Sequence, residues 1–148
     1  MRHVIVVGAG AAGLMAAGTA LKNGARVTVF EHMSRPGRKV MRTGKGRCNV
    51  TKYTDVDGLI AAAGKNGKFL YSAFAVFSAK DTMSLFESLG VPLKTERGNR
   101  VFPVSDNAED IVNALDRELK NLGVKIMRKA VKSLIIVDGE CKGVIADG

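Results

Sequence analysis

The feature that most constrains this 148-residue chain is the segment from His3 to Glu31. It joins a β-branched run, three glycines in the spacing GxGxxG, an alanine-rich stretch, and a second apolar run that ends in an acid. The periodicity predicts a strand over 3–7, a helix over 11–22 and a strand over 26–30. This order of strand, glycine turn, helix, strand and terminal acid is typical of a dinucleotide-binding unit.

Each glycine has a separate task in such a turn. Gly8 lets the chain leave the strand sharply, Gly10 leaves room for a pyrophosphate, and Gly13 lets the helix pack closely against the strands. The helix then directs its free N–H groups and positive dipole end at the phosphates. The Glu31 carboxylate can accept hydrogen bonds from a ribose diol and would repel a 2′-phosphate, which favours FAD or NAD over NADP.

Two other interpretations of this segment remain open. The glycines could serve only a tight helix–sheet contact, although Glu31 would then have no role. Arg2 and the small apolar residues after it could also belong to a secretory signal peptide, but the basic region is short and the glycines keep dinucleotide spacing. No stretch of about 20 apolar residues is free of glycine and charge, so no membrane span is predicted.

The two cysteines and the net charge of the chain argue against several classes of function. Cys48 and Cys141 are far apart and form no C-x-x-C, which argues against a disulfide scaffold or zinc site and for a reducing, cytoplasmic compartment. The net charge is +9, and basic residues crowd between Arg35 and Arg47. No aromatic residues are interleaved there, so an anionic cofactor or substrate is expected rather than nucleic acid. No metal site and no catalytic triad are recognisable.

The rest of the chain predicts an α/β domain with an inserted region. Residues 34–58 are expected to be a loop, and the apolar spacing from Phe69 to Phe77 predicts a helix packed in the core. Later elements are expected as a helix capped by Ser78, a hairpin around 97–100, a helix ending at Gly123, a third strand over 124–128, and a hairpin at 138–139. We expect one FAD/NAD(P)-binding domain over 1–148, with the long loop and helical insertion over 34–100.

The segment from Gly37 to Thr51, GRKVMRTGKGRCNVT, is the most distinctive motif in the chain. Together with the opening unit it resembles the HI0933-like family of bacterial flavoproteins, also called BaiN-like or aminoacetone-oxidase-like. The family pattern G-[RK]-K-x-x-x-[ST]-G-x-G-R-C-N-x-[ST] matches at every defined position. The segment from Arg100 to Ser105 also resembles the family element G-R-x-F-P-x-S, with Asn99 in place of its glycine.

The resemblance implies a Rossmann-like fold of the glutathione-reductase type, with a parallel three-stranded half-sheet and a β-hairpin, and FAD as the cofactor. It implies a role for each matching residue. The pyrophosphate is bound by the glycine turn, namely Gly8, Gly10, Ala11, Ala12 and Gly13. The adenosine ribose is bound by Glu31, further ribose or phosphate oxygens pair with Arg38 and Lys39, and adenine is contacted by Val131, at the edge of the third strand. The pyrophosphate and the flavin lie near a third group of residues: Thr43, Gly44, Gly46, Arg47, Cys48 and Asn49.

The implied function is that of the N-terminal part of an FAD-dependent oxidoreductase that acts on an unknown small substrate. Family members continue well beyond Gly148, so the chain is expected to be truncated and inactive by itself. Cys48 has no second cysteine nearby, and a packing or flavin-contact role is preferred to a redox role. The alternative is a non-catalytic nucleotide- or flavin-binding module that could associate with RNA, which the positive net charge would support.

Overall fold

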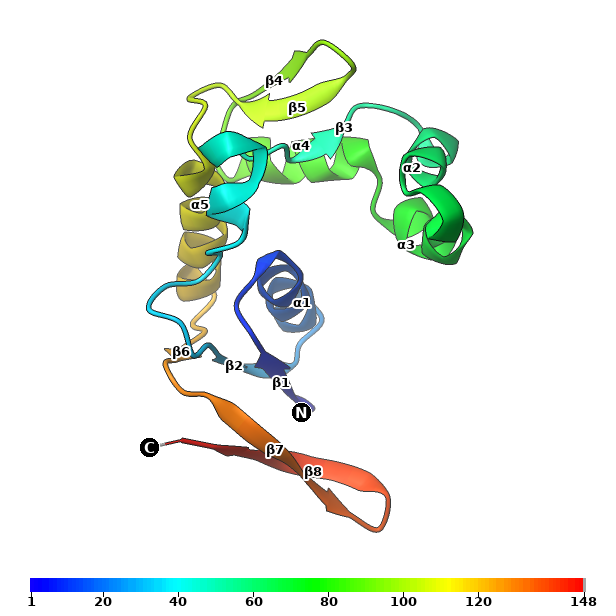
Figure 1. Cartoon of the computed structure of the whole chain (residues 1–148). Helices are drawn as coiled ribbons and strands as arrows, with labels where there is room; N and C mark the ends of the chain where they lie inside the picture. The colour runs from blue at the N-terminus through cyan, green and yellow to red at the C-terminus, as the bar shows by residue number, and fades with distance from the viewer. Residues whose placement is uncertain (148) are drawn as a thin grey trace. The chain divides into compact units, whose positions relative to one another are not determined.

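The computed structural model describes residues 1–147, which form two compact units. The first unit contains Met1–Val40 and the chain from Leu115 onward, and the second contains Met41–Ala114. Figure 1 shows the helices and strands of both units. The boundary between them falls inside one helix, α5 (Ala108–Asn121). The assignment of the whole chain to one cofactor-binding domain stays a prediction.

A parallel sheet organises the first unit. Its strands are β1 (His3–Val7), β2 (Arg26–Phe30) and β6 (Ile126–Met127), in the order β1-β2-β6. Both neighbouring pairs are parallel, and α1 (Ala11–Lys22) connects β1 to β2, as a parallel pair requires. The predicted strand–helix–strand unit is therefore confirmed, and the third strand is present but shorter than the predicted 124–128.

Apolar residues on α1 and the strands form the core of this unit. Leu14 and Ala17 of α1 are buried, as are Val27 and Val29 of β2. The helix ends at Asn23, and Gly24 follows with a φ of +78°, a conformation that glycine adopts without strain. The α/β pattern read from the sequence thus corresponds to a packed helix–sheet layer.

A two-stranded antiparallel sheet completes the first unit. Strands β7 (Val131–Val137) and β8 (Glu140–Ala146) are joined at Asp138-Gly139, where both φ values are positive, as in the tight turn that the sequence predicts. The prediction that Val131 lies at the edge of the third strand is wrong, because Val131 begins β7 and pairs with Ala146. Both residues of β6 pair with β2, and the Glu31 N–H donates to the Met127 carbonyl at 2.9 Å.

The second unit contains a small antiparallel sheet and short helices. The sheet order is β3-β5-β4, with β3 (Thr51–Lys52), β5 (Arg100–Pro103) and β4 (Leu93–Glu96). The helical elements are η1 (Val40–Gly46), α2 (Val56–Ala62), η2 (Gly64–Leu70), α3 (Tyr71–Val76) and α4 (Ala79–Ser88). The capping box of α4 is confirmed, since the Ser78 side chain accepts from the Asp81 N–H and Asp81 accepts from the Ser78 N–H.

Two expectations for this unit are wrong. Residues 34–58 are not a continuous loop, because η1 and β3 lie within them and α2 begins there. The apolar residues at helical spacing from Phe69 to Phe77 do not form a buried stripe: Phe69 is 89% exposed and Phe77 is 39% exposed. Helical spacing places residues on one face but does not say what covers that face, and η2 and α3 bury only Gly67.

Candidate functional site

The glycine turn of the first unit is closed by a contact that only glycine permits. A Cβ on Gly13 would lie 1.9 Å from the carbonyl oxygen of Gly8 and 3.3 Å from the Val6 side chain. Gly8 itself has a φ of +96°, which L side chains rarely adopt. The turn therefore brings the first turn of α1 directly against the end of β1, as the third glycine of a dinucleotide motif does.

Gly10 stands at the N-terminus of α1 and faces open space. A Cβ built on Gly10 would have no atom within 4 Å, and Gly10 caps the helix without any side-chain hydrogen bond. The first turn of α1 carries no acidic residue. The helix N–H groups at this end therefore face room for an anion, and the backbone fits a pyrophosphate approaching closely.

Glu31, directly after β2, is buried and bonded to the glycine turn. Its Oε2 accepts a hydrogen bond from the Ala9 N–H at 2.7 Å, and its Oε1 accepts one from the Met33 N–H at 2.8 Å. The ring of His32 lies 3.4 Å from Oε1. The argument that Glu31 would have no role without a ligand is therefore wrong, because the carboxylate holds the turn in shape.

Further backbone bonds join the turn to its surroundings. The Gly8 N–H donates to the Phe30 carbonyl at 2.7 Å, and the Gly37 N–H donates to the Ala9 carbonyl at 2.8 Å. Gly37 is the first residue of the family motif, so this motif begins in contact with the glycine turn. Arg38 and Lys39 follow it with exposed side chains.

In the second unit, the segment from Thr43 to Asn49 adopts a run of left-handed backbone conformations. The φ values of Gly44, Lys45 and Gly46 are +55°, +58° and +86°, and Cys48 has a φ of +60°. A Cβ on Gly44 would lie 3.3 Å from the Phe102 ring and 3.1 Å from the Asn49 nitrogen. The glycines of this motif therefore permit a tight turn against β5.

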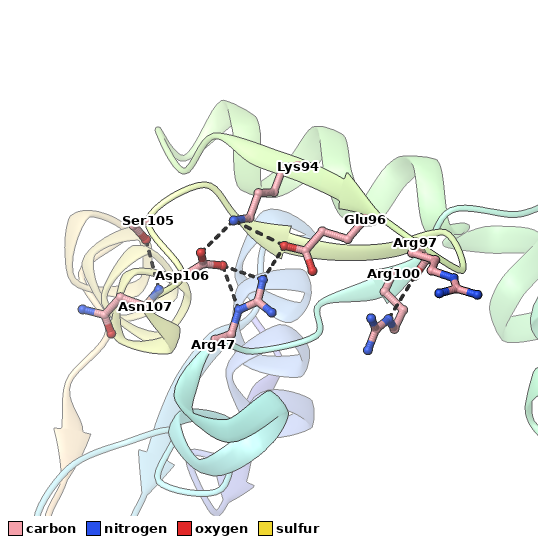
Figure 2. A network of polar contacts seen from close by, with 8 residues as sticks. All are labelled: Arg47, Lys94, Glu96, Arg97, Arg100, Ser105, Asp106 and Asn107. Atoms are coloured by element: carbon pink, nitrogen blue, oxygen red, sulfur yellow. Dashed lines mark hydrogen bonds and ion pairs between the residues drawn. The ribbon is translucent and has the colours of Figure 1, made fainter.

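Arg47 connects this turn to two acids that are distant in the sequence (Figure 2). Its Nε donates to Asp106 Oδ1 at 2.8 Å, and its Nη2 bonds to the Glu96 carboxylate. Lys94 bonds to Asp106 at 2.7 Å and lies 3.4 Å from Glu96. The Arg47 guanidinium also lies 4.2 Å from the centroid of the Phe102 ring, a cation–π contact.

These contacts change the acidity of the groups involved. Hydrogen bonds from Arg47 and Lys94 lower the pKa of Glu96, and those from Lys94 and Arg47 lower the pKa of Asp106. Neither acid was predicted from the sequence as a partner of the motif. The alternation of Lys94 and Glu96 in one strand places them on the same face, which was the available signal.

Cys48 is buried beside this network. Burial raises the pKa of its thiol, and a hydrogen bond with Thr43 opposes this effect. Cys48 and Cys141 are both free thiols. A buried thiol with a raised pKa is mostly protonated near neutral pH, which is consistent with the preferred packing role.

The predicted site residues therefore form two groups. The glycine turn, Glu31, Arg38 and Lys39 lie in the first unit, and Val131 lies on the hairpin of that unit. The segment from Thr43 to Asn49 lies in the second unit. Their contacts with a cofactor stay predictions.

The family model described as "HI0933-like protein Rossmann domain" matches residues 2–147. The chain belongs to the HI0933-like family. The suspected resemblance is thereby confirmed, together with the Rossmann-type fold. Within residues 1–147 of this HI0933-like chain, no helix has the length and apolar character needed to cross a membrane.

Curated relatives of the HI0933-like chain include two differently named proteins. The 3-dehydro-bile acid delta(4,6)-reductase of Clostridium scindens is 32% identical over 130 residues, which cover 85% of this chain and 31% of the relative. The ribosomal RNA dihydrouridine synthase of Haemophilus influenzae is 33% identical over 131 residues, covering 88% of this chain and 32% of the relative. The chain thus spans about a third of the length of these relatives.

Solved structures with the same fold include a flavocytochrome and a steroid dehydrogenase. A flavocytochrome c3 fumarate reductase in an open conformation gives a TM-score of 0.68 at 24% identity, over 98% of this chain and 31% of that chain. A 3-ketosteroid-delta4-(5alpha)-dehydrogenase from Rhodococcus jostii RHA1 gives 0.71 at 17% identity, over 99% of this chain and 42% of that chain. At these identities the likeness establishes the fold.

Proposed function

We propose that this chain is the FAD-binding part of a flavin-dependent oxidoreductase. The observation that carries the proposal is the glycine turn, where Gly13 packs onto Gly8 and leaves the N-terminus of α1 open at Gly10. Glu31, fixed at the end of β2, places a carboxylate beside that opening. An open helix N-terminus suits a pyrophosphate, and a carboxylate at this position suits a ribose diol without a 2′-phosphate.

The proposed roles follow the position of each residue. In the first unit, the backbone of Gly10, Ala11 and Ala12 would bind the pyrophosphate, Glu31 the ribose, and the exposed Arg38 and Lys39 further phosphate or ribose oxygens. For the other predicted residues, namely Val131 and the set Thr43, Gly44, Gly46, Arg47, Cys48 and Asn49, cofactor contact is proposed from the family resemblance. Bound FAD supplies two-electron redox chemistry, and the chain binds and orients it.

The names of two relatives suggest the class of reaction. A delta(4,6)-reductase of a 3-dehydro-bile acid and a dihydrouridine synthase both saturate a carbon–carbon double bond that is conjugated to a carbonyl. The net reaction adds two electrons and two protons across that bond. We therefore propose reduction of a conjugated carbon–carbon double bond for the protein that contains this chain.

Anaerobic titration of the intact protein tests this proposal. The bound flavin is first reduced with dithionite and then mixed with a steroid enone, with uridine-containing RNA, or with the saturated counterpart of each. The proposal expects the oxidised flavin spectrum to return with at least one unsaturated compound and with neither saturated one. A reduced flavin that no unsaturated compound reoxidises would contradict the proposed reaction and would favour a non-catalytic binding module.

A further inference from the structure

One end of the small sheet in the second unit carries cations that face each other. Lys52 of β3 and Arg100 of β5 are directly opposed in the antiparallel register, so their side chains emerge on the same face. Both residues are exposed. Like charges at directly opposed positions destabilise a strand pair, and a bound anion would remove this repulsion.

Arg97 adds a third cation at the same end. It lies in the turn between β4 and β5, and its carbonyl accepts a hydrogen bond from Arg100 Nε at 3.2 Å. Figure 2 shows Arg97 and Arg100 side by side, apart from the cluster around Arg47. Glu96 is also opposed to Arg100 in the register, but its carboxylate bonds to Arg47 and lies near Lys94.

These cations have no acidic partner in the described part of the chain. Within residues 1–147, no ion pair involves Lys52, Arg97 or Arg100. Arg47 and Lys94, by contrast, share the carboxylates of Glu96 and Asp106. The cations around Glu96 and Asp106 are therefore neutralised by ion pairs, whereas Lys52, Arg97 and Arg100 present three positive charges to solvent without an ion-pair partner among residues 1–147.

An exposed aromatic residue lies next to Lys52 in the chain, directly after β3. Tyr53 follows Lys52, its side chain is about half exposed, and its N–H donates to the Asn99 carbonyl at 2.7 Å, which holds it against the turn. The exposed aromatic residues of the described chain all fall between 53 and 77: Tyr53, Phe69, Tyr71 and Phe77. Lys65 and Lys68 lie in the same stretch, and no acid occurs between Gly64 and Phe77.

We propose that Lys52, Tyr53, Arg97 and Arg100 form a binding surface for single-stranded RNA. The three cations contact backbone phosphates, and the Tyr53 ring stacks on an unpaired base. A steroid carries at most one carboxylate and is bound in an enclosed apolar pocket, whereas this surface is open and basic. This inference names RNA as the substrate class and therefore rests on the proposed function. It also replaces the expectation from the sequence that nucleic acid is not a partner.

Fluorescence anisotropy with a labelled single-stranded oligoribonucleotide of about 12 nucleotides tests the surface on the intact protein. The double variant Arg97→Gln/Arg100→Gln is expected to weaken binding about tenfold and to reduce the salt slope by about 1.4, or 0.7 for each lost phosphate contact. The matched control is Lys120→Gln/Lys142→Gln, which removes the same charge from lysines that are paired with Asp116 and Glu140. This control should retain most of the affinity and the slope.

Two further variants test whether the Tyr53 ring stacks on a base. Tyr53→Ala is expected to weaken binding between about fivefold and a hundredfold, and Tyr53→Phe, which keeps the stacking ring, should bind as the parent does. The proposal is overturned if the parent does not bind the oligonucleotide at low salt, if either Tyr53→Ala or the arginine pair binds normally, or if the lysine control loses as much affinity as the arginine pair. Flavin content and its reduction by dithionite, measured on the same samples, separate this outcome from a failure of the proposed flavin function.

Discussion

The carboxylate of Glu31 accepts a hydrogen bond from the Ala9 backbone N–H at 2.7 Å, so the acid that ends the second strand is bonded to the turn that follows the first. Its other oxygen accepts from Met33. A single buried side chain thus fixes the shape of the glycine turn and provides negative charge beside it. This links the stability of the turn to its proposed ligand selectivity.

Glu31→Gln should destabilise the fold. The amide keeps one acceptor oxygen but presents an NH2 group to the second backbone N–H, so either Ala9 or Met33 loses its acceptor. A buried donor without a partner costs about 1–3 kcal/mol in free energy of unfolding, measured by urea denaturation. Glu118→Gln is the control, because Glu118 pairs with Lys22 at the surface and its loss should cost no more than about 1 kcal/mol. Equal stabilities of Glu31→Gln and the parent would contradict this account of the turn.

Replacement of two glycines of α1 by alanine should change the stability of the protein in opposite directions. Gly13→Ala places a methyl group 1.9 Å from the Gly8 carbonyl oxygen, and we expect a loss of more than about 2 kcal/mol of stability. The nearest atom to a Cβ on Gly18 is Leu119 Cδ2 at 3.7 Å, an ordinary contact, so Gly18→Ala should stabilise the protein by up to about 1 kcal/mol. Thermal unfolding of both variants gives the comparison. A Gly13→Ala protein as stable as Gly18→Ala would show that the close approach is absent in solution.

Cys48 should make stability fall at alkaline pH. Burial raises its pKa in the folded state, so its stabilising contribution is full below the ordinary thiol value of 9.0 and is lost as the pH rises above that value. Cys48→Ala should remove this part of the pH dependence. Iodoacetamide at neutral pH should label the exposed Cys141 much faster than the buried Cys48. Equal labelling rates, read by mass spectrometry, would show that Cys48 is accessible and reactive.

The ion-pair network around Arg47 should give the opposite pH dependence. The pKa values of Asp106 and Glu96 are lowered in the folded state, so their contribution is present above the ordinary values of 3.8 and 4.5 and is lost as the pH falls below these values. Asp106→Asn, which tolerates the positive φ at this position, should lower stability at neutral pH and flatten the acid limb. Glu87→Gln, at an exposed position, serves as the control. An unchanged acid limb in Asp106→Asn would mean that the network does not form in solution.

The sequence predicted the local elements of the fold well because their causes are local. The bounds of β1, α1 and β2 agree with the periodicity, and the turns at Gly24 and Asp138-Gly139 follow from residues that adopt positive φ. The close packing at Gly13 was likewise predictable, since the spacing of the three glycines requires it. These features depend on a few neighbouring residues.

Features that depend on distant residues were missed. The partners of Arg47 are 49 and 59 residues away in the chain, and no local pattern links them. The exposure of Phe69 was also missed, because helical spacing cannot say which face another layer covers. The second role of Glu31 required knowing that the turn folds back against β2.

The most direct test of the account is the identity of the nucleotide released from the intact protein on denaturation, measured by absorbance and mass. The proposed site predicts FAD in the parent protein, because Glu31 disfavours a 2′-phosphate and the N-terminus of α1 is open at Gly10. It also predicts a folded Gly10→Val protein without FAD, since the branched side chain has space but occupies the proposed position of the pyrophosphate. Recovery of NADP as the main nucleotide, or a normal FAD content in Gly10→Val, would contradict the central claim.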